Sequence, residues 1–288
     1  MTFRVHVLGS GSRGNSILLE TSETRIIVDA GFSGRQLERR LSAVEVAPDS
    51  IAALFITHEH RDHTQGMGVV ARRWKIPVYV ARATAASCSA LLGGDEDLRF
   101  YRAGRAVDLG DLRVEPFLTC HDAIDPVAVT VKQRSSGLKV GIATDLGTPT
   151  VSVRHALKRC DLLILEANHD ELMLRTGPYP WSLKSRIAGR HGHLSNRAAA
   201  LLGTELHHPE LAGVVLAHLS QECNEPELAA EVVGEALERK GYTAPLRVAT
   251  QDEPLAGLNV TAMAAAVRSP QLTLWDSLSS QPPAGHRW

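Results

Sequence analysis

The sequence contains few cysteines, and none of them lie close together. Cys88, Cys120, Cys160 and Cys223 are widely spaced and form no CxxC pair, which argues against a thiolate zinc finger and against a disulfide framework. The numbers of glycines and prolines are also modest, at 23 and 14 among 288 residues, while apolar residues make up 44% of the chain. Collagen-like, low-complexity and wholly disordered classes are therefore excluded, and a globular protein is expected.

Long apolar runs and an excess of one charge are missing as well. No stretch approaches the ~18 apolar residues of a membrane-spanning helix, and the first residues lack a basic region followed by a long apolar core. We therefore expect a cytoplasmic protein with no membrane partner. The 31 basic and 32 acidic residues nearly cancel, so attraction to phosphate would need a local cluster of cations. The absence of a repeat at a fixed period argues against a solenoid.

The order of apolar segments indicates two β-sheets. The length allows one large domain or two small ones. Strands are predicted at 3–8, 16–20, 25–29, 51–56, 78–80, 112–117, 127–132, 139–143, 161–166, 213–217 and 246–250. Helices are predicted at about 64–75, 82–92, 149–158, 195–206 and 225–240, with a further one capped by Ser33 that carries Leu37 and Leu41 on one face. This order favours two sheets packed face to face under outer helices.

A glycine-rich loop follows the first predicted strand. Gly9, Gly11 and Gly14 form a GxGxxG pattern, and Asp29 lies twenty residues after Gly9, as in a dinucleotide-binding fingerprint. That fingerprint requires a helix directly after the loop, whereas residues 15–20 have an extended, β-rich character. We therefore interpret the segment as a tight loop of small residues at the rim of a site.

Four side chains that can bind a metal follow the apolar strand at 51–56. His58, His60, Asp62 and His63 lie within six residues, and imidazole with carboxylate suits zinc, manganese or iron. Ordinary polar residues at a strand end are the alternative, but four such ligands in so short a loop favour a metal site. The interleaved Glu59 is expected to lie behind the ligands or on the surface.

This HxHxDH element resembles the signature of the metallo-β-lactamase fold. His121, Asp145 and His218, each after an apolar segment, match the remaining ligands of that pattern in order. The resemblance covers about residues 3–250 and implies an αβ/βα four-layer sandwich of two mixed β-sheets with outer helices. It further implies two divalent metal ions (Zn, Mn or Fe): one held by His58, His60 and His121, the other by Asp62, His63 and His218, with Asp145 bridging them.

Three further segments resemble the YycJ/WalJ-like branch of this fold. They are Leu8 to Ser16, Glu166 to Asp170 and Gly192 to Asn196. The branch is regarded as DNA exonucleases related to RNase Z and to the phosphonate-pathway phosphodiesterase. The resemblance implies 5′-to-3′ exonuclease activity, on DNA in preference to RNA, in which two ions roughly 3.5–4 Å apart activate a hydroxide. A phosphodiesterase for small cyclic or nucleoside substrates, and a non-catalytic metal-binding scaffold in a repair or cell-wall signalling assembly, remain alternatives.

A basic segment supplies candidate substrate contacts. Residues 175–197 contain five arginines and lysines with no acidic residue, and Tyr179 and Trp181 can stack on bases. A solvated basic loop is the alternative. His193 is expected to touch the scissile phosphate or protonate the leaving oxygen, or else to cap the helix that begins near Ser195. The predicted catalytic residues are Asp62, Asp145 and His193, and the predicted substrate-binding residues are Asn168, Arg186, Arg190, His193 and Ser195.

The last residues differ from the rest of the chain. We expect a metallo-β-lactamase-like hydrolase domain over residues 1–267 and a flexible C-terminal tail over 268–288. Within the tail, Gln271, Leu272, Leu274 and Trp275 belong to a QLTLW run that resembles the short peptides with which bacterial replication and repair proteins bind the sliding clamp. The alternative is that Leu274 and Trp275 pack back on the domain.

Overall fold

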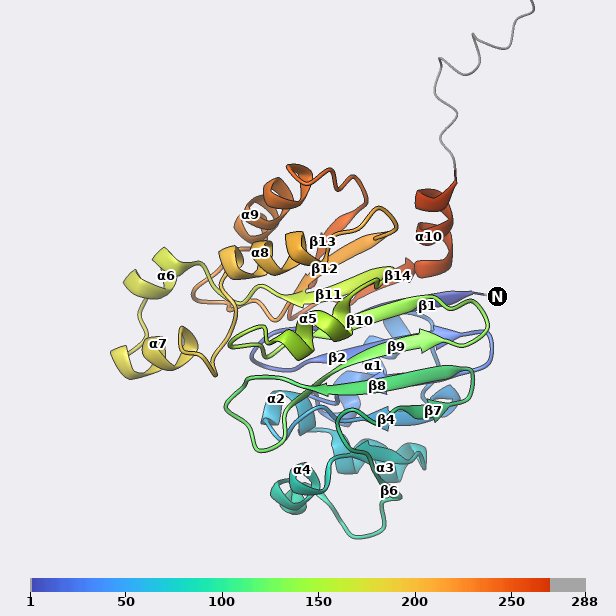
Figure 1. Ribbon diagram of the computed structural model, residues 1–288. Coiled ribbons are helices and arrows are strands. Elements are labelled where there is room, and N and C mark those ends of the chain that lie inside the picture. The colour runs from blue at the N-terminus through green and yellow to red at the C-terminus, as the bar shows by residue number, and fades with distance from the viewer. Residues whose placement is uncertain (1, 270–288) are drawn as a thin grey trace, which may run out of the picture.

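The computed structural model describes residues 2–269 of the chain (Figure 1). The part of the C-terminal tail from residue 270 onward, including the peptide predicted to bind a clamp, lies outside the described residues, so that prediction stays a prediction. Within residues 2–269, two seven-stranded sheets and their helices form the structure. No helix in this part of the chain is long and apolar enough to cross a membrane.

The first sheet is mixed, as expected. Its order is β14-β1-β2-β3-β4-β5-β6, with an antiparallel half from β14 to β3 and a parallel half from β3 to β6. The strands are β1 (Phe3–Gly9), β2 (Ser16–Thr21), β3 (Arg25–Val28), β4 (Ala53–Phe55), β5 (Val78–Val80), β6 (Leu98–Phe100) and β14 (Leu255–Asn259). The edge strand β14, which pairs with β1, thus comes from the C-terminal part of the chain.

The second sheet repeats this arrangement. Its order is β7-β8-β9-β10-β11-β12-β13, antiparallel from β7 to β10 and parallel from β10 to β13. The strands are β7 (Val107–Leu109), β8 (Leu112–Leu118), β9 (Val127–Gln133), β10 (Lys139–Ala143), β11 (Leu162–Glu166), β12 (Gly213–Ala217) and β13 (Leu246–Val248).

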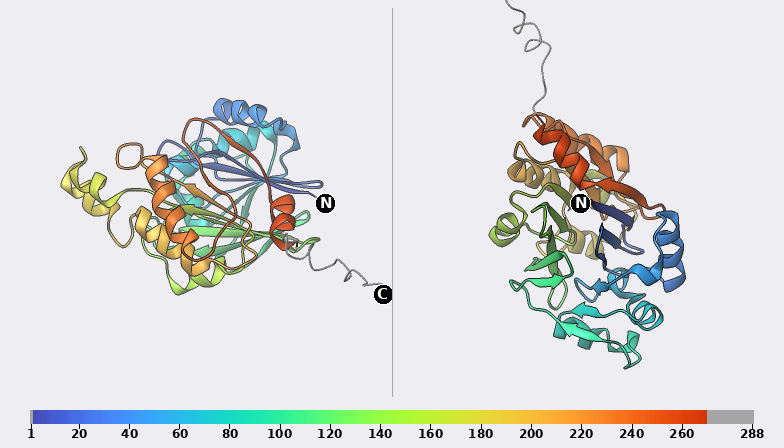
Figure 2. Two further views of the ribbon diagram at one scale, coloured as in Figure 1. Left: turned by 90° about the horizontal axis from the view of Figure 1, so that it is seen from above. Right: turned by 90° about the vertical axis from the view of Figure 1, so that its right-hand side faces the viewer.

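Helices cover the outer faces of both sheets, which completes the four layers (Figure 2). On the first sheet lie α1 (Gly34–Ala43), α3 (Met67–Trp74) and α4 (Arg82–Ser87), and on the second α5 (Val151–Leu157), α8 (Asn196–Leu206) and α9 (Pro226–Glu238). The remaining helices are α2 (Arg61–Thr64), α6 (Glu171–Thr176), α7 (Trp181–Ile187) and α10 (Val260–Arg268), with single 3₁₀ turns at Pro48–Ser50 and Ser89–Leu91.

Side-chain alternation explains the layers. Leu162 and Ile164 of β11 point into the core between the two sheets, whereas Leu163 and Leu165 point toward the outer helices. Because successive residues of a strand face opposite sides, a strand covered on both faces is apolar throughout. Continuous apolar runs therefore identified most of the strands, although β6, β7 and β14 carried no predicted range, and the αβ/βα sandwich is confirmed.

Some boundaries differ from the sequence-based prediction. The helix expected at 64–75 begins at Arg61 and divides into α2 and α3. Gly66 lies at the division, where a Cβ atom would lie 2.2 Å from the Phe32 carbonyl oxygen. The segment from β14 to α10, and helices α6 and α7 within the basic segment, carried no prediction. Helix α10 extends to Arg268, where its guanidinium pairs with Asp161 at 2.6 Å.

Candidate metal centre

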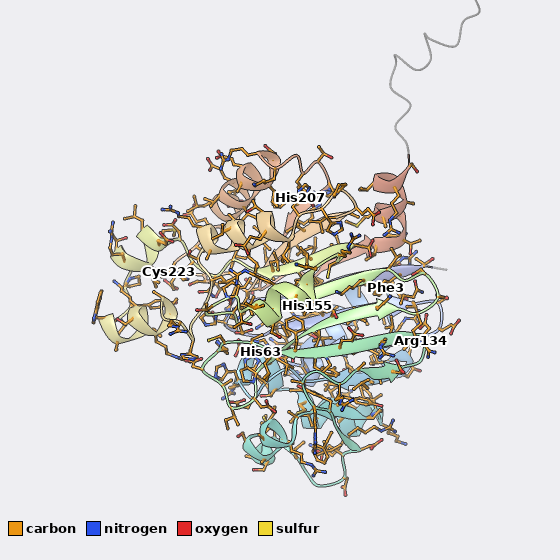
Figure 3. All side chains as sticks on the ribbon, viewed as in Figure 1. Phe3, His63, Arg134, His155, His207 and Cys223 are labelled. Carbon is orange, nitrogen blue, oxygen red and sulfur yellow. The ribbon has the colours of Figure 1, made fainter. Side chains whose placement is uncertain are left out.

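Polar loops from both sheets meet at one end of the sandwich. In Figure 3 His63 lies at the left, near the end of β8, while Phe3, at the start of β1, lies toward the opposite end. The loops that follow β1, β3, β4, β8, β10, β11 and β12 contribute Ser10 to Asn15, Asp29, His58 to His63, His121, Asp145, Asn168 and His218. Strand ends from two sheets therefore bring together residues that are distant in the sequence.

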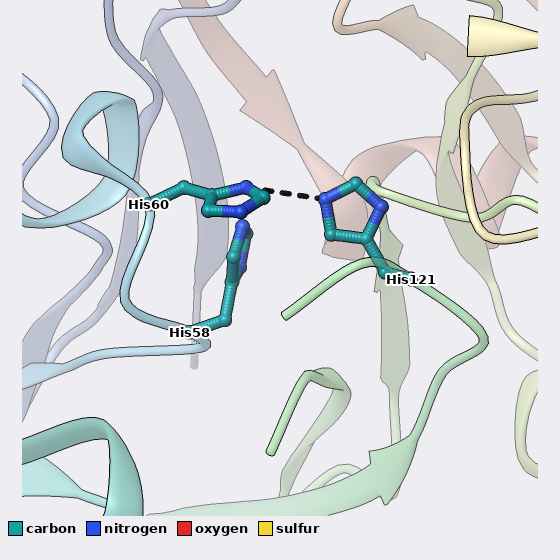
Figure 4. A group of neighbouring side chains, drawn as sticks. All are labelled: His58, His60 and His121. Atoms are coloured by element: carbon teal, nitrogen blue, oxygen red, sulfur yellow. Dashed lines mark hydrogen bonds between the residues drawn. The ribbon is translucent and has the colours of Figure 1, made fainter. Parts of the chain in front are cut away.

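Three histidines form the first ligand group (Figure 4). The side chains of His58, His60 and His121 place one nitrogen each within 4.8 Å of the others. His60 Nδ1 faces His121 Nε2 at 3.2 Å, and the ring of His58 stands edge-on to both neighbouring rings. Three neutral imidazole nitrogens that converge in this way can hold a divalent ion.

A carboxylate and two histidines form the second group. Asp62 Oδ2 lies 3.5 Å from His63 Nε2 and 3.4 Å from His218 Nε2. The three ligand atoms again lie within 4.8 Å of one another. His63 and His218 are buried, and their Nε2 atoms face this group instead of solvent.

Asp145 lies between the two groups. Its Oδ1 is 3.5 Å from His121 Nε2 of the first group, and its Oδ2 is 3.2 Å from His63 Nε2 of the second. Asp145 is buried, with 3% of the residue exposed. One carboxylate therefore reaches both ligand groups with different oxygen atoms, which is the geometry that a bridging ligand requires.

The backbone at this end of the sandwich is strained. Asp29, Asp145 and His218 have φ angles of 64°, 60° and 57°, in the left-handed region that non-glycine residues seldom occupy. Hydrogen bonds hold two of them there, because Asp145 N–H donates to Glu166 and His218 N–H donates to Ser10 Oγ. Strain of this kind persists only where surrounding contacts enforce it, and it concentrates at functional sites.

Buried atoms without partners support the assignment of a metal centre. Among residues 2–269, His58 Nε2 is buried and has no hydrogen-bond partner, and Asp145 Oδ2 is buried without a hydrogen bond and faces His63 Nε2 at 3.2 Å. A buried polar atom without a hydrogen bond is costly, and both residues belong to groups that could hold a metal ion. The donor set of imidazole and carboxylate also suits zinc, manganese or iron. The residues present therefore fit divalent ions.

The carboxylates and histidines of the site shift one another's pKa values. Burial alone would lower the pKa values of His63 and His218, but nearby carboxylates, Asp145 above all, raise both well above the ordinary value. Burial would conversely raise the pKa values of Asp62 and Asp145, but the histidines lower both. Burial lowers the pKa of His58. Protons on histidines thus balance the carboxylates, and a bound cation would replace those protons.

Glu166 is a central residue of the site that had no predicted role. Its side chain is fully buried, and Oε1 lies 2.8 Å from His193 Nδ1 and 2.9 Å from His218 Nδ1. Oε2 accepts a hydrogen bond from Leu194 N–H at 3.0 Å. A carboxylate at the second nitrogen of a ligating histidine fixes its ring and tautomer. The sequence feature that could have revealed Glu166 is its position at the end of an apolar strand.

Asp29 also acts behind the ligands. Its Oδ2 lies 2.7 Å from His63 Nδ1, and its Oδ1 accepts a hydrogen bond from Thr57 N–H at 2.8 Å. In the sequence this aspartate suggested only a dinucleotide fingerprint. No helix follows the glycine loop, which instead leads into β2, so the structure agrees with a tight loop beside the site. The Glu59 side chain joins neither ligand group, and its Oε1 accepts a hydrogen bond from Ile124 N–H in the loop after β8.

A cavity of about 260 Å³ opens over the ligand groups. Of the predicted substrate-binding residues, Asn168, Arg186 and His193 line it. Ser195 is instead the N-cap of α8, where its Oγ accepts from Ala198 N–H and donates to Glu171. Arg190 is exposed and does not line this cavity.

Arg186 crosses the cavity from α7 to the loop after β8. Its Nε donates to Asp122 Oδ2, and Asp122 Oδ1 lies 3.4 Å from His121 Nε2. Among residues 2–269, the Arg186 side chain has no other hydrogen-bond or ion-pair partner. Its two Nη atoms are therefore free to meet an anion, since a guanidinium presents several donor edges.

Sequence comparisons agree with this architecture. A family model described as "Beta-lactamase superfamily domain" matches residues 24–218. Exodeoxyribonuclease YycJ of Bacillus anthracis is 36% identical over 244 residues, covering 84% of this chain and 92% of that protein. Exodeoxyribonuclease WalJ of Streptococcus pneumoniae is 35% identical over 223 residues, covering 76% and 82%.

Solved structures share the fold at lower identity. The metallo-β-lactamase fold protein YhfI from Bacillus subtilis is similar with a TM-score of 0.68 at 15% identity, covering 88% of this chain and 98% of its own. A diphosphatase from the PhnP family gives 0.63 at 15%, covering 88% and 97%, and the short form of human tRNase Z gives 0.60 at 17%, covering 88% and 98%. These neighbours confirm the expected relation in fold.

Proposed function

We propose that this protein is a 5′-to-3′ exonuclease that hydrolyses phosphodiester bonds in DNA. The chain belongs to the metallo-β-lactamase superfamily, in the family that includes YycJ and WalJ, and it is a metal-dependent hydrolase. The observation that carries the proposal is the position of Asp145, whose two oxygens reach two separate ligand groups. Two adjacent metal ions are typical of enzymes that displace oxygen from phosphorus. The names of both curated relatives support DNA as the polymer.

The proposed ligands follow the geometry of the two groups. His58, His60 and His121 would hold one divalent ion, Asp62, His63 and His218 the other, and Asp145 both. When bound, such ions activate water and stabilise the negative charge that develops on the phosphate. Glu166 and Asp29 would orient ligands from behind, Glu166 through His218 Nδ1 and Asp29 through His63 Nδ1.

We propose that His193 is the general acid that protonates the leaving oxygen. The contact between its Nδ1 and Glu166 at 2.8 Å leaves Nε2 as the second ring nitrogen, and the residue lines the cavity. A histidine held in this way can act as a general acid toward a leaving oxygen. The alternative helix-capping role falls to Ser195 instead.

Arg186 is the proposed phosphate contact beside the ligands. Its Nε is held by Asp122, so its Nη atoms can bind a phosphate oxygen pair. Tyr179 also lines the cavity, and Trp181 on the same segment is 78% exposed. An exposed aromatic ring near a cation is suited to stacking on an unpaired base, which supports a single-stranded end as the substrate.

Changing Arg186 and Arg190 to alanine tests this contact surface. We expect weaker DNA binding and a salt dependence whose slope falls by about 1.4 to 1.8, which corresponds to two lost phosphate contacts. Hydrolysis of a small activated phosphodiester should barely change. Arg239→Ala on α9, where the side chain pairs with Glu235 on the surface, is the matched control. Equal losses on both substrates would show that the arginines serve the metal centre or the fold.

The proposed function is tested by product analysis. Purified protein, supplied in turn with manganese and zinc, is incubated with end-labelled single- and double-stranded DNA and RNA. We expect mononucleotides released from the 5′ end of DNA. Activity on a mononucleotide diester without activity on any oligonucleotide would instead establish the small-molecule phosphodiesterase. Tight metal binding with no hydrolysis of either would favour the non-catalytic scaffold.

The C-terminal peptide is proposed to bind the sliding clamp. Deleting residues 270–288 should abolish clamp binding and leave metal content, melting temperature and oligonucleotide hydrolysis almost unchanged. A peptide spanning 268–278 should bind the clamp by calorimetry at about the micromolar level or weaker, because ordering a short peptide on binding costs free energy. A loss of several degrees in melting temperature on deletion would show that these residues stabilise the domain, and absence of peptide binding would exclude the clamp.

A further inference from the structure

The glycine-rich loop makes direct contacts with the second ligand group. Asn15 Nδ2 lies 3.1 Å from Asp62 Oδ2, to which it donates a hydrogen bond, and 3.1 Å from His63 Nε2. Asn15 Oδ1 accepts a hydrogen bond from Ser10 Oγ at 2.9 Å, and Ser10 Oγ in turn accepts from His218 N–H at 2.8 Å. The loop therefore touches all three members of the group, two of them through Asn15 itself.

From these contacts we propose that Asn15 and Ser10 are positioning residues that set the spacing of Asp62, His63 and His218 and thereby the affinity for the second metal ion. The proposal rests on the ligand assignment of the proposed function. Neither residue would bind the ion. They would hold its ligands at the distance the ion requires, which is the usual effect of partners behind a metal site.

The backbone leaves Asn15 little freedom. Its N–H donates to Asp62 carbonyl oxygen at 2.7 Å, and its own carbonyl accepts from Gly31 N–H at 3.0 Å. The chain segments pass so closely that a Cβ at Gly31 would lie 1.7 Å from the Asp62 carbonyl oxygen. Because Asn15 is also 4% exposed, its amide is held in place, and removing it would take away the hydrogen bond that Asp62 Oδ2 accepts from outside the ligand group.

The contacts link the two halves of the molecule. Ser10 and Asn15 follow β1 of the first sheet, while His218 follows β12 of the second. The relay from His218 through Ser10 and Asn15 to Asp62 thus spans the gap between the sheets at the site. Among residues 2–269, neither Asn15 nor Ser10 hydrogen-bonds to a member of the first ligand group. The expected effect is therefore specific to one ion.

Metal titration of four proteins tests the proposal. Wild type, Asn15→Ala, Ser10→Ala and Arg13→Ala are stripped with chelator and titrated with zinc by calorimetry, and bound metal is counted by elemental analysis. Wild type should bind two ions. Asn15→Ala should bind the first ion normally and the second about 10- to 100-fold more weakly, and raising the zinc concentration should restore two bound ions. Ser10→Ala should show a smaller loss in the same direction.

A control variant tests whether the effect is specific to Asn15 and Ser10, and a double variant tests whether these two residues act together. Arg13 belongs to the same loop but pairs with Asp252 at the surface, so Arg13→Ala should behave as wild type. If the relay acts as a unit, adding Ser10→Ala to Asn15→Ala should weaken the second ion little further.

Three outcomes would overturn the proposal. One is an Asn15→Ala protein with a normal melting temperature in which both ions weaken equally or neither weakens. If Asn15→Ala does not fold, an unchanged second-ion affinity in Ser10→Ala overturns it instead. A wild-type protein that binds a single ion would overturn this proposal together with the dinuclear assignment, whereas two ions bound with wild-type affinity by every variant would remove only the role of Asn15 and Ser10.

Discussion

Asp145→Ala is expected to abolish hydrolysis while leaving the fold largely intact. The substitution removes the carboxylate that reaches both ligand groups, and two ions without a common ligand would repel each other. Several kcal/mol of transition-state stabilisation would be lost, which corresponds to about three orders of magnitude in rate. Activity on labelled DNA and metal content by elemental analysis are the measurements.

The matching control is Asp252→Ala, because that carboxylate is exposed and pairs with Arg13 outside the site. It should retain both metal content and activity. Circular dichroism of Asp145→Ala should match the wild type, which separates lost chemistry from lost folding. Turnover at the wild-type rate in Asp145→Ala would contradict the dinuclear assignment.

Glu166→Gln should reduce hydrolysis by about 10- to 100-fold, as expected for a residue that orients ligands. Its carboxylate contacts the Nδ1 atoms of His193 and His218 together, so both the second ligand group and the proposed proton donor lose their orientation. An amide of the same size keeps one acceptor oxygen and replaces the other with an NH2 donor group. The free energy of unfolding at pH 7 should fall by about 1–3 kcal/mol, because buried partners lose an acceptor.

The pH dependence of this stability difference is a separate check. Burial would raise the pKa of Glu166, but His193 and His218 lower it to about 2, below the value of about 4.3 in an unfolded chain. A group whose folded pKa is lowered contributes stability that is present above its unfolded pKa and lost as the pH falls through the folded one. In metal-free protein, the difference between wild type and Glu166→Gln should therefore be largest above about pH 5 and shrink toward pH 2. A constant difference would exclude the charge of Glu166 as its cause.

The sequence by itself determined the layers and the candidate ligands. Strands buried on both faces are apolar throughout, so most of them could be located without a structure. His58, His60, Asp62 and His63 stood out as four metal-competent residues in a short loop after an apolar strand. The resemblance to the metallo-β-lactamase pattern then pointed to His121, Asp145 and His218, each of which follows an apolar segment. Strand ends of a sheet lie along common edges, and such residues can therefore be expected to meet. Helices α6 and α7 escaped prediction because their short segments carry no clear apolar period.

Only the tertiary structure decided which residues stand behind the ligands. Glu166 meets His193 and His218 across 27 and 52 positions of the chain, and Asn15 meets Asp62 across 47. These hydrogen bonds form because the folded chain brings the two side chains close together. The number of residues between them in the sequence does not predict that proximity. The pairing of β14 with β1 was hidden for the same reason, because it joins the two ends of the chain and depends on how the sheets are assembled.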